Sequence, residues 1–549
     1  MAYLDYAGLQ RFKNKIDESH KAYVDEHIKH ILTPENYKEV MKEWFEANGC
    51  NAMSDVTELC ERWYNISRTG WLGGTKFSKP SESTLSTGTK IGDNATLTCT
   101  PSTNTTAGKD DYAGIPLFVP LDCHANLDSD GKMHITAIDG ICGEFNRYDT
   151  TKITAVIQMA PWVKYSEDAV SFTWEYTDQK NLPGFEPWCD SIELDGHIRN
   201  FVCHVKYALD DTYGSASGQK VRTWDVSHNS ARTAIKSAKG NRYCAITSSD
   251  LAWIKMMMYI KYGSLTMDNI MAGCFSYYNH PNIAVAETDV ERVIVPKSSV
   301  YVVGSTVCVG GDYSGTKSTM VSVVDRAVIT SIETVTIDGA EYTALNLDNG
   351  GVKFSTTTDN FITTMPWRTG ATDNVKGNDG SPISNSSVKE PYKLQGIELM
   401  MGCYEVMGDV ILKHVTVDGV QYQKAFVVRD VTKNATSVTS DYIEPEYGFP
   451  VQDSSKWVFI GSNGRDGNLP ELIFPDSVGG TSSTLTRDEY YIETTSDGAL
   501  REALLFCRLD HSLAHGGVST VVGNGSLGNT NWYIGSRVSL NGNRGEWAA

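Results

Sequence analysis

The 549-residue sequence lacks long apolar runs and has fewer basic than acidic side chains. No stretch approaches the 18 or so uninterrupted apolar residues of a membrane-spanning helix, so we expect no membrane insertion. Lys and Arg number 48 against 67 Asp and Glu, and the formal net charge is −19. Because nucleic-acid binding depends on cationic contacts to phosphate, this balance argues against a nucleic-acid partner.

The sequence also lacks a secretory signal and any paired-cysteine motif. The start, MAYLDYAGLQRFKNKI, has no basic region followed by an apolar block, so we expect synthesis in a cytoplasm and release by assembly or lysis. The 12 Cys include no Cys-x-x-Cys pair and no neighbouring His at zinc spacing. The simplest interpretation is a set of reduced, mostly buried thiols that build no metal site.

Catalytic motifs are missing as well. There is no Gly-x-Ser-x-Gly elbow, no His-Glu-x-x-His and no phosphate-binding loop. The stretches DSDGK (128–132) and GSNGRDGN (461–468) are interpreted as turns rather than cation sites. His511 and His515 lie four apart beside Asp510, but the residues around them do not support a long helix. We therefore assign no catalytic residue, no metal ligand and no cofactor.

Residues 1–47 are predicted to be a helical segment for oligomerisation or attachment, with helix over 5–45. Apolar residues recur on one face of this helix at a heptad-like spacing, which shifts in register and then continues. Such an apolar face needs a partner surface. The partner is either the rest of this chain or further copies of the segment. The residues of this face are Leu9, Phe12, Ile16, Tyr23, Val24, Ile28 and Ile31.

Residues 48–109 are predicted to be a Ser/Thr-rich linker with irregular β structure. Between 78 and 107 nearly half of the residues are Ser or Thr, a composition that buries little surface. Residues 110–284 then alternate short β-like runs with turns and contain one clear helix, DLAWIKMMMYIKYG, capped by Ser248 or Ser249. Its apolar face, with Leu251, Ile254 and Met258, indicates packing on a sheet rather than a cofactor pocket.

Residues 285–366 change character and are predicted to form a small all-β domain, a barrel, inserted into the surrounding chain. Its β-branched runs are separated by Asp-Gly and Asn-Gly-Gly turns, which supply the positive φ of tight hairpins. Residues 367–549 then resume the alternation of short β-like runs and loops that precedes the insert.

The tail contains the frame FCRLDHSLAHGGVSTVVGNGSLGNTNWYIGSRVSLNG, which includes Gly516-Gly517, Asn531-Trp532 and Ile534-Gly535-Ser536-Arg537. This frame resembles the C-terminal variable region of phage receptor-binding proteins that retroelements diversify. The helix at 250–263 and the stretch PWRTGATDNVKGNDGSPISNSSVKEPYKLQGIEL resemble the core helix and middle loop of such proteins. The N-terminal YLDYAGLQRFKNKI resembles the start of structural proteins from phages of Gram-positive gut bacteria.

The resemblance implies an α+β fold in which a C-type-lectin-like domain, 110–284 and 367–549, is interrupted by the all-β insert. It implies a non-enzymatic host-adsorption protein of the phage tail, located in the virion. The implied partners are a bacterial surface receptor, protein or glycan, and other tail proteins. By analogy with tail fibres, we expect a homotrimer.

The resemblance also divides the tail into a frame and variable positions. Loops on a rigid scaffold tolerate change, and Tyr and His offer large contact area with polar tips. Tyr533 is expected to point outward between inward Trp532 and Ile534. The implied scaffold of the site is Gly516, Gly517, Trp532, Gly535 and Arg537. The implied ligand-binding positions are Arg508, His511, Ser512, His515, Val518, Val521, Val522, Ser526 and Tyr533.

Two alternatives stay open at this stage. The first is an enzyme, either a tail depolymerase of cell-wall glycan or a lectin-like fold used as in formylglycine-generating enzymes. The latter need a reactive Cys pair, and Cys403 and Cys507 are the only Cys among the last 180 or so residues, with no supporting spacing. The second is a structural tail or baseplate protein whose C-terminus packs internally.

Overall fold

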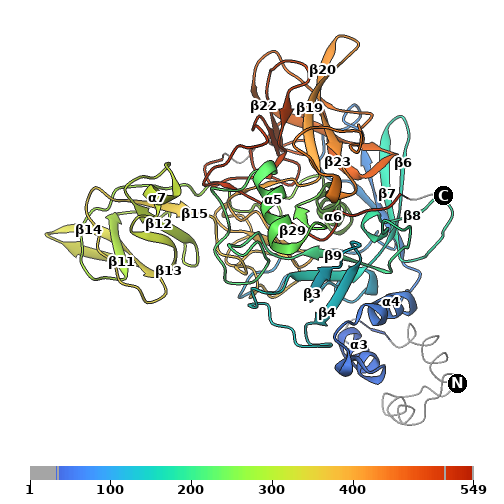
Figure 1. The fold of residues 1–549 in the computed structure, drawn as a ribbon, viewed down its shortest axis with the longest axis horizontal. Coiled ribbons are helices and arrows are strands. Elements are labelled where there is room, and N and C mark those ends of the chain that lie inside the picture. The colour runs from blue at the N-terminus through green and yellow to red at the C-terminus, as the bar shows by residue number, and fades with distance from the viewer. Residues whose placement is uncertain (1–31, 34–35, 512–514, 547–549) are drawn as a thin grey trace.

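The structure, a computed structural model, describes residues 32–33, 36–511 and 515–546. It combines few helices with several open sheets, in agreement with the α+β class. Figure 1 shows a large body, from which the segment around β11–β15 projects to one side. No helix within the described part of the chain is long and apolar enough to cross a membrane.

Two helices near the N-terminus pack beside the body (Figure 1). They are joined through aromatic contacts, because the Trp63 indole donates a 2.8 Å hydrogen bond to the Tyr37 hydroxyl and tilts against Trp44. The first helix begins only at Tyr37, and residues 32–33 are not helical, so the expected helix over 5–45 is not continuous. The predicted apolar face from Leu9 to Ile31 lies outside the described residues. The elements here are α3 (Tyr37–Ala47), η2 (Cys50–Ala52) and α4 (Thr57–Ile66).

The linker expected over 48–109 is in part wrong, because α4 and an inner strand of a sheet fall within it. The Ser/Thr-rich stretch is mostly loop, yet it reaches the core: the buried Asn94 amide donates to the carbonyls of Gly74 and Ile260, both at 3.0 Å. Composition underestimates such burial because small polar side chains are buried when they are hydrogen-bonded. The sheet runs β2-β1-β7-β6-β8, with β1 (Leu72–Ser78), β2 (Thr89–Gly92), β6 (Trp162–Glu167), β7 (Ser171–Thr177) and β8 (Glu186–Pro187).

The predicted helix becomes α6 (Ser248–Met257), which continues as the π-helix η5 (Met258–Tyr262). Its N-cap is Thr247, one residue before the expected cap. The Thr247 hydroxyl accepts from the Asp250 amide, and the Asp250 carboxylate accepts from the Thr247 amide. All ten residues of α6 are buried, so the helix lies in the centre and not with one face outward.

The first half of the chain contains a further sheet and several helices. A second sheet has the order β4-β3-β5-β9, with β3 (Leu121–Leu127), β4 (Met133–Ile138), β5 (Thr154–Met159) and β9 (Phe201–Val205). The further elements are η3 (Pro116–Phe118), η4 (Cys189–Ser191), α5 (His228–Lys239) and β10 (Cys244–Ala245).

Apart from the four-residue helix α7, the insert is β structure, as expected, but it is an open sheet with the order β11-β14-β13-β12-β15 and not the expected barrel. The edge strands β11 and β15 do not pair with each other. The predicted turns are present: φ is 50° at Asp338, 83° at Gly339, 69° at Gly350 and 74° at Gly351. The elements are β11 (Arg292–Pro296), β12 (Thr306–Gly310), α7 (Lys317–Met320), β13 (Val324–Ile337), β14 (Ala340–Asp348) and β15 (Phe361–Met365).

The C-terminal third builds a seven-stranded sheet, β23-β22-β24-β27-β26-β18-β28, and a four-stranded sheet, β21-β20-β19-β25. The stretch 461–468, expected as a turn, lies mainly in the hairpin of β22 and β23. The first sheet contains β18 (Tyr404–Val406), β22 (Lys456–Asp466), β23 (Leu469–Val478), β24 (Glu489–Ile492), β26 (Leu504–Phe506), β27 (Val521–Gly523) and β28 (Ile534–Gly535). The remaining elements are β16 (Tyr392–Leu394), β17 (Ile397–Leu399), β19 (Val410–Val417), β20 (Val420–Val427), η6 (Val431–Lys433), β21 (Phe449–Pro450), β25 (Leu500–Arg501) and β29 (Val538–Ser539).

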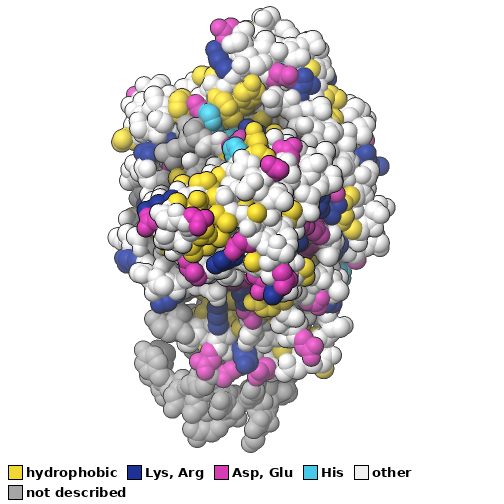
Figure 2. Space-filling view, turned by 90° about the vertical axis from the view of Figure 1, so that its left-hand side faces the viewer, with side chains coloured by type: hydrophobic (Ala, Val, Ile, Leu, Met, Phe, Trp, Pro, Cys, Tyr) yellow, Lys and Arg dark blue, Asp and Glu magenta, His cyan; other side chains and the backbone are white. Residues whose placement is uncertain are grey.

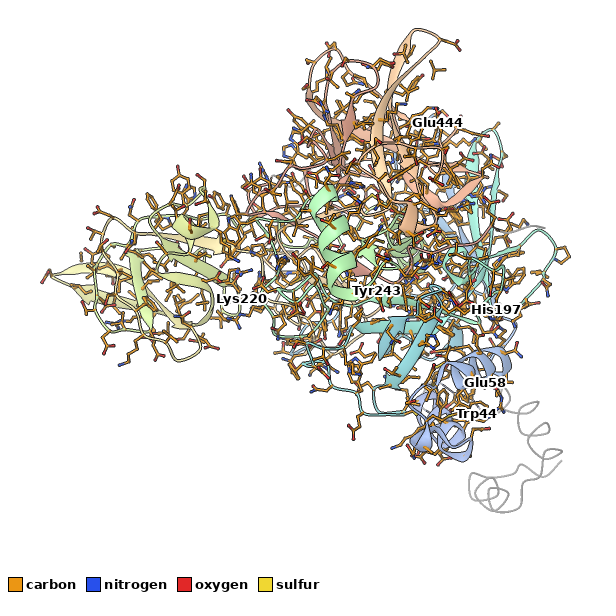
Figure 3. The ribbon with its side chains drawn as sticks, in the orientation of Figure 1. Trp44, Glu58, His197, Lys220, Tyr243 and Glu444 are labelled. Carbon is orange, nitrogen blue, oxygen red and sulfur yellow. The ribbon has the colours of Figure 1, made fainter. Side chains whose placement is uncertain are left out.

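The insert and the body share a hydrophobic core. Besides a core of its own, the insert contributes Cys308 and Met320 to a cluster that contains Leu509 and Trp532 of the tail. Lys220, labelled at this junction in Figure 3, places its Nζ 3.1 Å from Oδ2 of Asp325 in the insert. The junction is therefore packed, and the tail is part of it.

Candidate functional site

The end of the chain is fixed inside the body by strand pairing and an ion pair. β28 runs parallel to β18, and β29 pairs with β10, so residues 534–539 form two short strands in two sheets. Between them Arg537 is buried and forms a two-point ion pair with Glu405, at 2.7 and 2.6 Å. It also donates to the Glu398 carbonyl at 2.8 Å. A buried arginine satisfied in this way holds the backbone in one position.

The glycines assigned to the scaffold sit where a side chain does not fit. A Cβ on Gly516 would lie 2.7 Å from Cγ of Phe275, and one on Gly517 would overlap the Asp488 carboxylate. A Cβ on Gly535 would lie 3.0 Å from the Arg222 carbonyl oxygen. With the buried Trp532, these contacts give each of the five predicted scaffold residues a structural role.

Above this framework lies a group of partly exposed side chains that we call the C-terminal patch, composed of Trp457, Tyr491, Arg508, Asp510, His515 and Tyr533. At one end of the patch, His515 stacks on Trp457, and Tyr491 meets Trp457 edge-on at 5.3 Å. The His515 Nε2 lies 2.9 Å from the Glu489 carboxylate. Trp457 and Tyr491 precede the tail in sequence, and no motif pointed to them.

At the other end of the patch, the Arg508 guanidinium lies over the Tyr533 ring, 4.2 Å from its centroid. Arg508 Nε is 2.6 Å from Oδ1 of Asp510. Tyr533 is half-buried between the buried Trp532 and Ile534, which agrees with the predicted alternation. Its hydroxyl accepts a 2.9 Å hydrogen bond from the Asn531 amide. The guanidinium and the phenol thus lie where a ligand can reach them.

His511 was predicted to contact a ligand, but it is buried beneath the patch and connects its two ends. Its Nε2 lies 2.6 Å from the Tyr404 hydroxyl and its Nδ1 lies 2.7 Å from the His515 carbonyl. Burial, with the Arg508 charge nearby, lowers the pKa of His511 to about 3, so the ring is neutral. A neutral ring that donates a hydrogen bond from Nδ1 accepts one from the tyrosine hydroxyl at Nε2. Neither nitrogen is therefore left for a metal.

The prediction that three valines bind a ligand is wrong. Val518, Val521 and Val522 are buried, with exposed fractions of 1%, 1% and 6%. β27, which carries the last two, lies between β24 and β26 in the sheet. Val521 and Val522 are successive strand residues that point to opposite faces, and both are buried, so both faces of β27 are covered. Valine at these positions serves packing, not recognition.

Of the last two predicted positions, one lies on another loop and one is not described. Ser526 is exposed, but its loop rests on the N-terminal end of α5, where the Asn229 amide donates to the Leu527 carbonyl at 2.8 Å. Ser512 lies outside the described residues. The structure thus brings together three of the nine predicted positions: Arg508, His515 and Tyr533.

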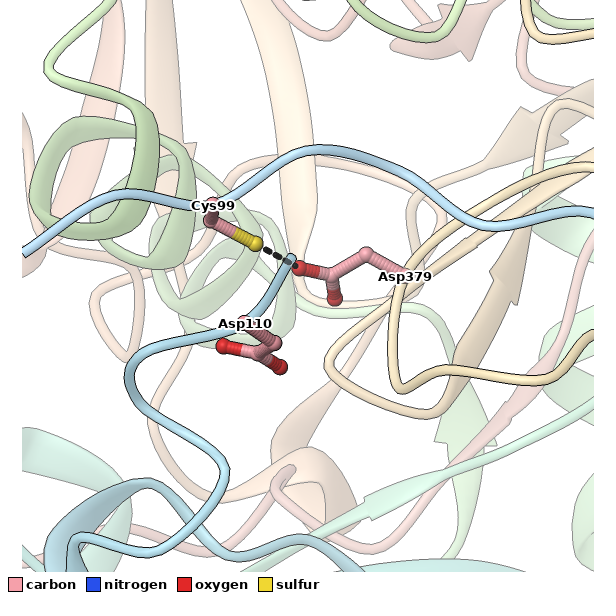
Figure 4. Close-up of side chains that lie close together, drawn as sticks. All are labelled: Cys99, Asp110 and Asp379. Carbon is pink, nitrogen blue, oxygen red and sulfur yellow. Dashed lines mark hydrogen bonds between the residues drawn. The ribbon is translucent and has the colours of Figure 1, made fainter. Parts of the chain in front are cut away.

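The cysteines are free thiols, and of the twelve only Cys99 is not fully buried. Cys99, Asp110 and Asp379 lie close together (Figure 4), but Lys261 already occupies the place of a cation. Its Nζ is 2.6 Å from Asp379 and 3.3 Å from Asp110. Because a buried ammonium neutralises this cluster, it is an internal ion network.

The cysteine pair relevant to an enzymatic role is also buried. Cys403 and Cys507 are 2% and 0% exposed, and burial raises the pKa of both thiols. A thiol needs its thiolate form to act as a nucleophile, so this environment disfavours reactivity.

Comparison with known proteins supplies no relative from which residue roles could be transferred. No protein-family model matches this chain, and no curated protein sequence matches it. The arguments below therefore rest on the residues and their geometry.

Proposed function

We propose that this protein is the host-adsorption protein of a phage tail, and that it binds a bacterial surface receptor through the C-terminal patch. The observation that carries the proposal is the combination of a fixed framework with partly exposed Trp, Tyr, Arg and His side chains on it. These residue types dominate the binding energy of many protein surfaces. A framework that loses little entropy on binding favours affinity.

The finer architecture belongs to this proposal. Residues 110–284 and 367–549 form a C-type-lectin-like domain, and a retroelement diversifies Arg508, Ser512, His515, Ser526 and Tyr533 in the virion protein. The DNA beside the gene tests this directly. A near-identical template repeat with a reverse transcriptase gene supports diversification, and a neighbourhood with tail genes but without both leaves an undiversified adsorption protein.

Binding to whole cells tests the adsorption function. The fluorescently labelled chain is incubated with a panel of cultured Gram-positive gut bacteria, and binding to at least one strain is expected. Arg508→Ala combined with Tyr533→Ala should weaken that binding at least about tenfold, because two central contacts are lost. Tyr342→Ala, in the insert hairpin away from the patch, is the matched control. Unchanged binding by the double variant contradicts the proposal.

The oligomer and the alternatives have separate readouts. We propose a homotrimer joined to other tail proteins through residues 1–47, since several copies of a weak site raise avidity. Light scattering of the full chain gives the mass of the assembly. Release of soluble saccharide from purified cell walls would instead favour a glycan-degrading enzyme. Absence of binding to every strain, with the chain present in virions, would favour a structural tail protein.

A further inference from the structure

A stack of four rings runs from the tail into the insert. Trp532 stacks on Tyr278 at 5.2 Å, Tyr278 lies against His280 at 4.6 Å, and His280 stacks on Tyr313 at 4.2 Å. Tyr313 belongs to the loop 311–316, between β12 and α7 of the insert. The Tyr278 hydroxyl donates to the Tyr313 carbonyl at 2.9 Å, which fixes this loop against the body.

The same loop lies beside the C-terminal patch. Burial raises the pKa of Tyr278, and the nearby carboxylates of Asp510 and Asp312 add to this rise. Tyr278 therefore lies near both a patch residue and the insert loop. Its amide also donates to the Leu509 carbonyl at 3.0 Å, between Arg508 and Asp510. The patch and the loop 311–316 are neighbours across the domain junction.

Several ring faces of this region already have a contact within the protein. His515 covers a face of Trp457, Arg508 covers a face of Tyr533, and Tyr278 lies between two other rings. A sugar ring stacks on an open aromatic face, so each of these contacts takes one such face away from a glycan ligand. Ring edges, hydroxyl groups and a guanidinium remain, and these suit the mixed polar and apolar contacts of a protein interface.

The charge pairs of the patch also favour a protein ligand. Arg508 is paired with Asp510, and His515 lies against Glu489, so the patch has no surplus cation for an anionic polymer. Figure 2, which looks onto the side of the insert, shows positive and negative side chains interspersed around apolar patches, with histidines beside the upper one. Such a surface offers complementarity to a folded surface rather than a field of one sign.

We propose that the C-terminal patch and the insert loop 311–316 form one composite binding surface, and that its ligand is the surface of a folded protein on the bacterial cell. This inference rests on the proposed adsorption function. It makes the insert part of the receptor site, and two contributing domains supply the breadth of a protein interface, about 800 Å² on each partner.

The test uses a strain that the labelled full chain binds. Intact cells are treated with proteinase K or, separately, with periodate, which cleaves sugar diols. We expect protease to abolish binding and periodate to leave it unchanged. Ser314→Arg, at an exposed position of the loop, should weaken binding at least about tenfold, because a long charged side chain then stands in the interface. Thr336→Arg, exposed on the far hairpin of the insert, is the matched control and should bind normally.

Each outcome separates the two proposals. Binding to no strain overturns the adsorption function itself. Binding that periodate abolishes, with or without protease sensitivity, shows that a sugar is required and overturns the protein ligand. Normal binding by Ser314→Arg, while Arg508→Ala with Tyr533→Ala fails to bind, removes the insert from the site and leaves the adsorption function standing. Matching thermal unfolding curves of the variants exclude misfolding as the cause.

Discussion

The imidazole of His515 lies parallel to the indole of Trp457, with an interplanar angle of 12° and a centroid distance of 4.2 Å. The two residues are far apart in sequence, since Trp457 belongs to β22 and His515 to the tail. The position of a tail side chain is therefore set by a strand that the tail itself does not contain.

Trp457→Ala should weaken binding to host cells about as much as a substitution in the tail. Removal of the indole takes away the support of His515 and one of the largest partly exposed rings of the patch. We expect a loss of roughly tenfold or more in cell binding by flow cytometry. Tyr342→Ala serves as a control at a remote aromatic residue, and equal binding by both variants would contradict the role of Trp457.

Arg537→Met should destabilise the folded protein by about 3–5 kcal/mol, because Glu405 is then left buried without its partner. Urea unfolding measures the change. The combined variant Arg537→Met with Glu405→Met should cost less than Arg537→Met alone, since no buried charge remains unpaired. Arg508→Met is the surface control, with a cost of about 1 kcal/mol or less. Equal costs at Arg537 and Arg508 would show that the buried pair does not anchor the tail.

Gly517→Ala should be poorly tolerated, whereas Gly528→Ala should be nearly neutral. A Cβ at Gly517 overlaps the buried Asp488 carboxylate, and nothing lies within 4 Å of a Cβ at Gly528. Overpacking of this kind costs about 1–3 kcal/mol or more. Thermal unfolding of both variants decides the matter, and a stable Gly517→Ala protein would mean that this loop is free to move.

Substitutions by asparagine should separate the buried from the exposed variable positions. Val521→Asn places an unpartnered amide in a central strand and should cost about 2–4 kcal/mol in the free energy of unfolding. Ser526→Asn, on an exposed loop, should change it by about 0.5 kcal/mol or less. If Val521→Asn proved as stable as Ser526→Asn, the valines could vary freely after all.

The stability of the protein should fall as the pH drops below about 6.5, in part because of His511. The folded state keeps this ring neutral, with a pKa lowered by burial to about 3, whereas the unfolded chain binds a proton near pH 6.5. The unfolded state thus gains protons first, and the free energy of unfolding falls by up to about 1.4 kcal/mol per pH unit between those values.

His511→Gln removes this proton and should flatten the pH profile by about one proton, while His228, with its pKa lowered to about 4, still titrates in both proteins. Urea unfolding between pH 8 and pH 5 measures the two slopes. Identical slopes would show that His511 is protonated in the folded protein.

Much of the fold followed from local patterns. The glycine turns of the insert and the central helix were predicted from residue type and spacing, because positive φ and apolar runs are local properties. The barrel was wrong because strand patterns do not determine whether a sheet closes. The linker over 48–109 was in part wrong because hydrogen bonds such as those of Asn94 are long-range and leave no mark on composition.

The candidate site was likewise predicted only in part. The glycine and arginine frame of the tail was predicted from its resemblance to variable regions of phage receptor-binding proteins, and its residues lie in tight backbone contacts or are buried. Trp457 and Tyr491 were missed because only the pairing of β22 with β24 brings them beside the tail. The valines were misassigned because the sequence of the tail does not show which of its positions face the core. Their burial depends on the pairing of β27 with β24, which comes earlier in the sequence.

The core shared by the insert and the tail limits how this protein can be shortened. Cys308 and Met320 of the insert pack in the same cluster as Leu509 and Trp532. Deletion of residues 285–366 would therefore strip an apolar cover from the last strands of the body and leave an aggregation-prone surface beside the patch. Although the insert interrupts the sequence of the body, it packs against the tail, and neither can be replaced without a change in the other's core contacts.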